Sequence, residues 1–322
     1  MTAAVPRISL VVPTYQRSAS VRRLLGALFE QTLPRTDFEV VVSIDGSVDG
    51  TREMIGGFAG ILPVRAIWHP NRGRAAACNA GIAESRGEVL VLLDDDMEPA
   101  PGFLAAHAAA HESRARRAVL GAVPVTVDDR SPSAATYIRA KFERHDAKLA
   151  QPGYVIGFRD FYSGNLSIRR ELLLGIWLFD EGFKVYGNED GELALRLLAA
   201  GVELVYSREA AAAQHYEKDF AALARDSVAK GETAVLTVRK HPGTLPNLRL
   251  GHYHSGSRKW RLLRAALLRL SRVVHATPRG VIWVMGRLER RRSPKLHRYY
   301  RLALDYFFWL GVGPDVREWK RR

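Results

Sequence analysis

The stretch Val89–Pro99 reads VLVLLDDDMEP and joins an apolar run directly to three consecutive aspartates. Five aliphatic residues without polar alternation are typical of a strand that is buried on both faces of a parallel sheet. In open sheets of this kind, ligands bind beyond the carboxyl ends of the strands. The sequence therefore places Asp94, Asp95 and Asp96 where a binding site is expected.

Similar apolar runs alternate with helical patterns over the first 200 residues, which predicts an α/β fold with a mostly parallel sheet covered by helices. The predicted strands are Ile8–Val12, Phe38–Ile44, Val64–Trp68, Val89–Leu93, Val119–Val127 and Val202–Tyr206. The predicted helices are Ser18–Gln31, Gly50–Phe58, Gly73–Ser85, Gly102–Ser113 and Asp190–Ala200. The polar and basic stretch Asp128–Pro152 has no regular pattern, so we expect an excursion from the sheet there.

The three adjacent aspartates repel one another unless a cation neutralises them. A hard divalent cation binds oxygen ligands and also binds the oxygens of a diphosphate. Such an ion stabilises the charge that builds on a departing nucleoside diphosphate. A solvated acidic turn is the other interpretation of the same residues.

A second acidic cluster opens a predicted helix, where Glu189, Asp190 and Glu192 lie within the stretch NEDGELALRLLAAG. Acids in a first turn interact favourably with the helix dipole, by about 0.3–1 kcal/mol each, which explains the cluster without catalysis. A carboxylate beside the anomeric carbon of a bound sugar would instead take the proton from an attacking hydroxyl. The pattern leaves both interpretations open.

Polar residues also follow the first two predicted strands. They are Pro13, Thr14, Tyr15, Asp45 and Gly46. Tyr15 has the ring to stack on a nucleobase, and Asp45 has the carboxylate to accept from a base N–H, although Asp-Gly is also a common turn pair. Since the carboxyl ends of parallel strands meet at one sheet edge, a nucleotide site is predicted here.

Two arginines and a histidine are further candidate ligands. Arg72 and Arg74 lie at the start of a predicted helix in NRGRAAACNAG, where glycines and backbone amides suit a phosphate but form no phosphate-loop motif. His215 follows the last predicted strand and could complete a metal shell as a neutral imidazole. With ten histidines in the chain, an ordinary surface position is the alternative.

The positive charge of the chain is concentrated at its C-terminal end. Residues 249–322 hold 19 Lys and Arg against 4 Asp and Glu, whereas residues 1–248 have a net charge of −1. Three apolar and arginine-rich segments, Arg258–His275, Gly280–Arg287 and Leu302–Val312, are shorter than the about 20 apolar residues that cross a bilayer. Their pattern predicts helices at an anionic membrane surface, or helices packed on the body or on a second subunit.

A single cysteine, Cys78, excludes an intramolecular disulfide, and the opening residues show no basic segment followed by an apolar run. We therefore expect a cytosolic setting, with the basic region at the inner face of a membrane. Two domains are expected. Residues 1–248 would bind the nucleotide sugar with about 1–98 and the acceptor with about 99–248, and residues 249–322 would form a basic helical extension.

Six stretches, taken in order, resemble the family 2 glycosyltransferases. They are VVPTYQR, SIDGSVDG, NRGRAAACNAG, VLVLLDDDMEP, SGNLSIRR and FDEGFKVYGNEDGELALRL. The resemblance covers about residues 7–206, and its specificity lies in the order of the stretches. It implies the GT-A fold, a Rossmann-like and mostly parallel sheet flanked by helices. It also implies a nucleotide-diphospho-sugar donor, with UDP favoured, together with Mg²⁺ or Mn²⁺ and inversion at the anomeric carbon.

The resemblance assigns roles to residues at matching positions. Asp94 and Asp96 match the DxD signature, in which the first aspartate commonly faces the ribose and the last binds the metal. Asp190 matches the aspartate that usually acts as the base. Gly164 and Asn165 match the block that lies near the donor sugar and the acceptor.

Other positions extend the resemblance or depart from it. His215 lies where many members place a metal-binding histidine. Ile44 stands where many members have the first aspartate of a pair, so base recognition through Asp45 departs from the family pattern. The QxxRW block and spanning helices of processive members are absent from the sequence. We therefore expect one sugar to be added per encounter. Because the basic region would hold the protein at an anionic bilayer, we expect the acceptor to be a hydroxyl of a lipid-linked or cell-envelope glycan.

Two other functions fit part of the sequence. A sugar nucleotidylyltransferase has a related fold and acidic metal ligands, but VVPTYQRSAS lacks the glycine-rich basic loop that such an enzyme needs. A basic nucleic-acid-binding protein would use residues 249–322, yet arginine mixed with long aliphatic residues suits a bilayer or packed helices better than a groove. We therefore expect a metal-dependent glycosyltransferase.

Overall fold

The computed structural model describes residues 5–113 and 115–313, which form two compact units. The first unit comprises the described residues up to Thr126, together with Arg139–Lys184 and Glu189–Tyr216. The second comprises Val127–Ile138, Val185–Asn188 and the described residues from Glu217 onward. Residues 314–322, the end of the predicted basic region, lie outside the described residues.

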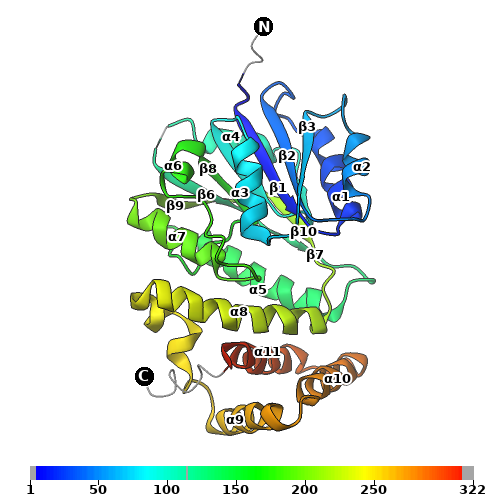
Figure 1. The fold of residues 1–322 in the computed structure, drawn as a ribbon, viewed down its shortest axis with the longest axis vertical. Coiled ribbons are helices and arrows are strands. Elements are labelled where there is room, and N and C mark those ends of the chain that lie inside the picture. The colour runs from blue at the N-terminus through cyan, green and yellow to red at the C-terminus, as the bar shows by residue number, and fades with distance from the viewer. Residues whose placement is uncertain (1–4, 114, 314–322) are drawn as a thin grey trace. The chain divides into compact units, whose positions relative to one another are not determined.

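The first unit is built on a seven-stranded sheet (Figure 1). Its strands, in spatial order, are β3 (Val64–His69), β2 (Phe38–Asp45), β1 (Ile8–Thr14), β4 (Val89–Leu93), β8 (Asn165–Arg169), β6 (Arg117–Gly121) and β9 (Glu203–Ser207). Only β8 runs antiparallel to its neighbours in this sheet. The predicted mostly parallel sheet is therefore confirmed, and the end of β4 carries the three aspartates at its centre.

Helices and a small second sheet complete the first unit. The helices are α1 (Ser18–Ala27), α2 (Thr51–Gly56), α3 (Arg74–Glu84), α4 (Phe103–Ala110), α6 (Arg170–Gly175) and α7 (Glu189–Ala199), with a 3₁₀ turn at Leu28–Glu30. The small sheet has the order β5 (Met97–Pro99), β10 (Ala212–His215) and β7 (Val125–Thr126). The strand predicted across Val119–Val127 is thus two strands, since Pro124 between them lacks an amide hydrogen for pairing.

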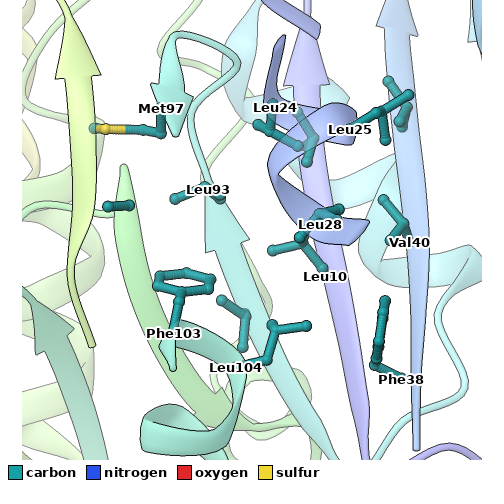
Figure 2. Close-up of a cluster of buried hydrophobic side chains, with 14 of the residues drawn as sticks. Leu10, Leu24, Leu25, Leu28, Phe38, Val40, Leu93, Met97, Phe103 and Leu104 are labelled. Carbon is teal, nitrogen blue, oxygen red and sulfur yellow. The ribbon is translucent and has the colours of Figure 1, made fainter. Parts of the chain in front are cut away.

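Apolar side chains fill both faces of the main sheet. Val89, Val91 and Leu93 of β4 belong to one buried cluster, and Leu90 and Leu92 belong to another. Figure 2 shows part of the first cluster, where side chains of β1, β2, α1 and α4 meet. This alternation between two cores explains the VLVLL run, because a strand covered on both sides needs no polar residues.

The segment Asp128–Pro152 leaves the sheet as predicted, but the expected lack of regular structure was wrong, because helix α5 spans Ser133–Leu149 there. Its buried positions follow helical spacing, with Ala134, Ala135 and Ile138 inside and Leu149 buried at the far end. The interleaved basic and polar residues lower the mean apolar character of the segment and hide this spacing. Helix α5 crosses the boundary between the units, since its residues up to Ile138 belong to the second unit and those from Arg139 onward to the first.

The second unit is helical. It contains α8 (Phe220–Lys240), two 3₁₀ segments (Pro242–Asn247 and Arg249–His252), α9 (Arg258–Val273), α10 (Thr277–Arg290) and α11 (Leu296–Val312). Helix α8 belongs with the C-terminal helices, and Ser227 Oγ donates to the carbonyl of Leu304 at 2.7 Å. The expected boundary at residue 248 therefore differs from the observed one, which follows Tyr216.

The helices predicted beyond residue 251 are present, but not every arginine among them faces outward. Arg264 of α9 is buried, donates to Asp305 Oδ2 at 2.8 Å, and lies over the rings of Tyr253 and Trp309. None of the helices within the described ranges has both the length and the apolar character that a bilayer crossing requires.

Candidate active site

A single guanidinium links the two acidic clusters of the sequence. Arg74, the first residue of α3, donates from Nη2 to Asp94 Oδ1 at 2.7 Å and from Nε to the same oxygen at 3.2 Å. Its Nη1 lies 3.4 Å from Asp190 Oδ1 and 3.8 Å from Glu189 Oε1. The acids that follow β4 and the acids that open α7 therefore border one site, as the sequence predicts.

Among the three acids that open α7, only Asp190 keeps substantial exposure. Its side chain is 30% exposed, against 5% for Glu189. Glu192 is engaged by Arg196, one turn further along, with a closest contact of 2.7 Å. Ser163 Oγ and Arg74 Nη1 both donate to Oδ1 of Asp190, so the other carboxylate oxygen takes no part in these contacts. Asp190 is thus the acid of this turn best placed to accept a proton.

Gly164 allows the carboxylate of Asp94 to lie against the backbone of the segment that leads into β8. A Cβ at position 164 would overlap Asp94 Oδ2, and the Asp94 amide donates to the Gly164 carbonyl at 3.0 Å. Any side chain here would displace the first aspartate of the DxD pair. The predicted Gly164 thus borders the site, and its function there is to leave space.

The second and third aspartates of the triplet interact with β1 and with the residue that precedes α1. Thr14 Oγ1 donates to Asp95 Oδ2 at 2.7 Å. Arg17 Nη1 lies 3.4 Å from Asp95 Oδ1 and 3.2 Å from Asp96 Oδ2. Burial, together with the charges of Asp96 and Asp94, raises the pKa of Asp95 to about 7, although Arg17 and Thr14 oppose the rise. Arg17 and Arg74 therefore offset part of the negative charge of the triplet, a contribution that was not predicted from the sequence.

The surroundings of Asp96 suit a hard cation in part. Gln214 Nε2 lies 3.3 and 3.4 Å from the two Asp96 carboxylate oxygens, and Gln214 Oε1 is buried without a partner among the described residues. A carboxylate beside an unsatisfied amide oxygen is a donor set that Mg²⁺ or Mn²⁺ accepts. No group of three or more His, Cys, Asp or Glu side chains in residues 5–113 and 115–313 is already arranged around a metal position.

His215 lies beside the same aspartate, but it has a partner of its own. Its backbone amide donates to the Asp96 carbonyl at 2.9 Å, and its Nε2 lies 2.6 Å from Glu98 Oε2. A metal-bound histidine usually donates its other ring N–H to a carboxylate, so the Glu98 contact leaves Nδ1 as the nitrogen that would hold a metal. The metal role of His215 stays a prediction.

Asp45 is occupied by the loop that precedes α3. Its carboxylate accepts from the amides of Arg72 at 2.7 Å and Gly73 at 3.0 Å. Gly46 has a φ of +77°, and a Cβ there would lie 2.7 Å from the Asn71 amide nitrogen, so a side chain is excluded. Asp45 therefore fixes the start of α3. In the predicted contact with a nucleobase, the Asp45 carboxylate oxygens would have to accept through lone pairs that the amides of Arg72 and Gly73 do not use.

Two exposed aromatic residues flank the end of β2. Tyr15 follows β1 and Trp68 lies near the end of β3, and both side chains are exposed. Trp68 Nε1 donates to the Ser47 carbonyl at 3.0 Å, which fixes its indole ring. Tyr15 was predicted from the sequence as a stacking residue, whereas Trp68 was not.

Asn165 differs from its predicted role, because its side chain is fully buried and every polar group is used. Its Nδ2 donates to the carbonyls of Ala122 and Ala210 at 3.0 and 2.9 Å, so its Oδ1 accepts from His107 Nε2 at 3.0 Å. An acceptor or sugar cannot reach it. We therefore assign Asn165 to the support of the strand behind Gly164.

A directed hydrogen-bond chain continues from Asn165 into α4. Since His107 Nε2 donates to Asn165, its Nδ1 accepts from Ser167 Oγ at 2.7 Å. Ser167 Oγ then has only acceptor capacity left, so His111 Nε2 donates to it at 2.9 Å. Burial lowers the pKa of His107 to about 4 despite the Asn165 contact, and burial with the nearby Arg169 and Arg117 lowers that of His111 to about 4.

The buried histidines predict that the free energy of unfolding falls as the pH drops from 6.5 to about 4. Within this window the unfolded chain binds protons that the folded chain excludes, so each histidine contributes a slope of about 1.4 kcal/mol per pH unit. Urea unfolding at a series of pH values measures this slope of the free energy of unfolding. His107→Gln should remove one of the two contributions, whereas an unchanged slope in that variant would show that His107 titrates normally.

Several site residues were missed in the sequence. Arg17, Ser163 and Gln214 contact the predicted acids, and Glu98 contacts the predicted His215. Three of them lie within the stretches that carry the family resemblance, so their sequence context was informative. The bonding partners of the arginines, in contrast, are up to 116 positions away and follow only from the fold.

The amino-acid sequence matches the model of a known family. Residues 9–177 match "Glycosyl transferase family 2". The chain is 30% identical over 275 residues to validoxylamine A glucosyltransferase of Streptomyces hygroscopicus subsp. jinggangensis, which covers 77% of this chain and 64% of that protein. It is 35% identical over 101 residues to glycosyltransferase AglE of Haloferax volcanii, which covers 31% of this chain and 33% of that protein. The chain thus spans less than two thirds of the length of these relatives.

Solved structures agree with the GT-A fold. The mannosyltransferase PcManGT from Pyrobaculum calidifontis, solved with GDP-Man and Mn²⁺, gives a TM-score of 0.62 at 20% identity over 99% of this chain and 89% of that one. S. aureus TarS, solved with UDP-GlcNAc, gives 0.52 at 16% identity over 97% and 92%. These likenesses confirm the predicted fold. Together with the match over residues 9–177, they lead to one conclusion: this chain belongs to glycosyl transferase family 2.

Proposed function

We propose that this protein transfers a sugar from a nucleoside diphosphate to an acceptor hydroxyl by a single displacement with inversion. The observation that supports this most strongly is the Arg74 guanidinium, which contacts Asp94 and Asp190 at once. One site therefore holds both a carboxylate at the donor end of the sheet and a carboxylate suited to act as a base. A single displacement needs a base beside the anomeric carbon of a donor that is held in the same site.

In this proposal Asp190 takes the proton of the acceptor hydroxyl through its uncommitted carboxylate oxygen. Ser163 and Arg74 hold the other oxygen, so the orientation of the carboxylate is fixed before the acceptor arrives. Holding both substrates in line removes roughly 7–11 kcal/mol of barrier, which makes this positioning as important as basicity. Glu189, buried beside Arg74, would support the charge balance of the pair rather than contact substrate.

A divalent ion, Mg²⁺ or Mn²⁺, would be held by Asp96, with Gln214 and His215 as further ligands. When bound, it neutralises the diphosphate as the sugar departs. Arg17 and Arg74 would then contact the donor through guanidinium groups that now face carboxylates. The neighbours solved with Mn²⁺, GDP-Man and UDP-GlcNAc support this assignment.

For the donor base we propose stacking on Tyr15, with Trp68 as the second aromatic surface of the same edge. UDP is our preferred donor nucleotide. For the acceptor we propose a hydroxyl of a lipid-linked or cell-envelope glycan, reached by a protein that is peripheral at the inner face of the membrane. Transfer of one sugar per encounter completes the proposal.

A thermal-shift panel of nucleotide sugars with Mn²⁺ tests the proposal without an acceptor. A donor at about 100 times its Kd stabilises the folded state by about 2.7 kcal/mol, and the shift should shrink when Mn²⁺ is removed by a chelator. The panel would include UDP-, GDP- and ADP-sugars, with free sugars as controls. If no nucleotide sugar raises the Tm, and the protein instead makes a nucleotide sugar from a nucleoside triphosphate and a sugar phosphate, the proposal fails.

A further inference from the structure

The exposed face of α9 is apolar, with cationic residues along its edges. Leu262, Leu263, Leu270 and Val273 all face outward, and Val273 is 80% exposed. The exposed arginines of the helix are Arg258, Arg269 and Arg272. The buried residues of α9 are Arg264 and Leu268. The four exposed aliphatic side chains therefore form an apolar face that the rest of the unit does not cover.

Polar interactions hold the inner face of α9. Arg264 and Trp260 both donate to Asp305 Oδ2 of α11, each at 2.8 Å. The tail has one more described acid, Glu289, which accepts from Tyr300. Both acids are therefore engaged within the unit. The outer surface of α9 and α10 thus keeps the positive charge of its arginines without compensation from these two carboxylates.

Helix α10 has the same character around one tryptophan. Trp283 is 60% exposed, and the Arg287 guanidinium lies 5.0 Å from its ring centroid. Arg279 and Arg290 are exposed on the same face at helical spacing from Trp283. An indole ring among arginines is the composition that proteins place at the level of lipid headgroups.

We propose that the outer faces of α9 and α10 dock on a bilayer that contains anionic lipid. We name this surface the docking face and define it by Leu262, Leu263, Leu270, Val273, Trp283 and Val284, with Arg258, Arg269, Arg272, Arg279, Arg287 and Arg290 around them. Its aliphatic and indole groups enter the headgroup boundary. Its arginines pair with lipid phosphates, and both helices lie in the plane of the surface.

Charge decides between this occupant and two others. A second copy of the chain would bring an equally cationic face against the first, and like charges placed face to face repel. A nucleic acid would pair with the arginines but would leave the exposed leucines and valines in water. Only an anionic bilayer satisfies both components. The purpose of docking rests on the proposed function, since a lipid-linked acceptor is presented at such a surface.

Co-flotation of the full chain with vesicles tests the proposal. We expect binding to phosphatidylcholine vesicles that contain phosphatidylglycerol, weak binding without it, and a decrease with added salt. Changing Arg258, Arg269 and Arg272 to glutamine should weaken binding about 100-fold, since each cation near an anionic surface contributes about fivefold. The matched control changes Arg22, Arg52 and Arg130, three exposed arginines elsewhere, and should bind as the unmodified protein does.

A second pair of variants tests the apolar component. Leu262→Ser with Trp283→Ser should lower vesicle binding about tenfold or more, while Val155→Ser with Trp177→Ser, exposed residues of the first unit, should not. Equal binding to neutral vesicles, or normal binding of both docking-face variants, would overturn the proposal. So would a dimer that the serine variant dissociates, or duplex DNA binding that needs only the arginines. The nucleotide-sugar thermal shift should be the same in every variant, so failure of docking and failure of the transferase proposal remain distinguishable.

Discussion

Asp190→Asn is expected to lower the turnover number for the donor by about 10²–10⁴-fold while donor binding stays within about twofold. The amide keeps the shape of the carboxylate and can still accept from Ser163 and Arg74, but it cannot take a proton. Turnover is measured as release of nucleoside diphosphate, and binding is measured by thermal shift with Mn²⁺. The loss should therefore fall on the turnover number and not on the affinity.

Two further variants serve as controls for the Asp190→Asn result. Glu203→Gln removes an exposed acid at the start of β9 and should leave turnover unchanged. Glu189→Gln removes the neighbouring buried acid and should lower stability more than turnover, because its carboxylate lies beside Arg74 away from solvent. If Asp190→Asn turned over at a near-normal rate while Glu189→Gln did not, the base would be Glu189.

Asp96→Ala is expected to weaken Mn²⁺ binding at least about 100-fold, given that loss of an outer partner of a metal ligand alone costs 10–100-fold. The carboxylate of Asp96 faces the amide of Gln214, and its removal leaves that amide without the anionic group that a hard cation requires. Titration of Mn²⁺ in the presence of UDP, followed by its electron paramagnetic resonance signal, measures the affinity directly.

Stability has to be measured in parallel, since Asp96 also contacts Arg17. Asp96→Asn keeps the side-chain shape and should show a similar loss of metal affinity with a smaller loss of stability. Asp129→Ala, which removes an exposed acid of the second unit, is the control and should bind Mn²⁺ normally. Unchanged Mn²⁺ affinity in both Asp96 variants would remove the metal role from this residue.

The centre of the sheet could be predicted closely. The strand Val89–Leu93 has the bounds that the sequence predicts, because an uninterrupted apolar run followed at once by acids leaves no other boundary. The same reasoning placed β1 and β2 to within two residues at each end. Helix α5 was missed because lysines, arginines and acids between its buried positions mask the apolar spacing.

The site could be predicted as a set of acids, but not as a network. That Asp94 and Asp190 approach each other followed from strand ends and from the family resemblance. Which cation joins them did not follow, because Arg74 reaches a partner 116 positions away and sequence spacing carries no such information. Asn165 shows the opposite error, since a match to a family block says nothing about whether the side chain faces the substrate or the interior.

In the second unit, the amino-acid composition predicted the surface charge but not which residues are buried. The net charge of residues 249–322 predicted a basic surface, yet Arg264 lies inside and pairs with Asp305. A buried arginine is stable only when its charge is paired, and the sequence gives no sign of where that partner is. The apolar residues of α9 were also expected to face inward or toward a membrane, and only the fold shows that four of them face outward.

The central claim is that a divalent cation and a nucleoside diphosphate bind together beside Asp96, within reach of Asp190. An anomalous difference map at the manganese edge, from crystals grown with Mn²⁺ and UDP, tests it most directly. We predict one strong peak between the Asp96 carboxylate and the diphosphate, with the base at the edge that carries Tyr15. A nucleotide bound elsewhere, or bound at this edge with no manganese peak, would contradict the account.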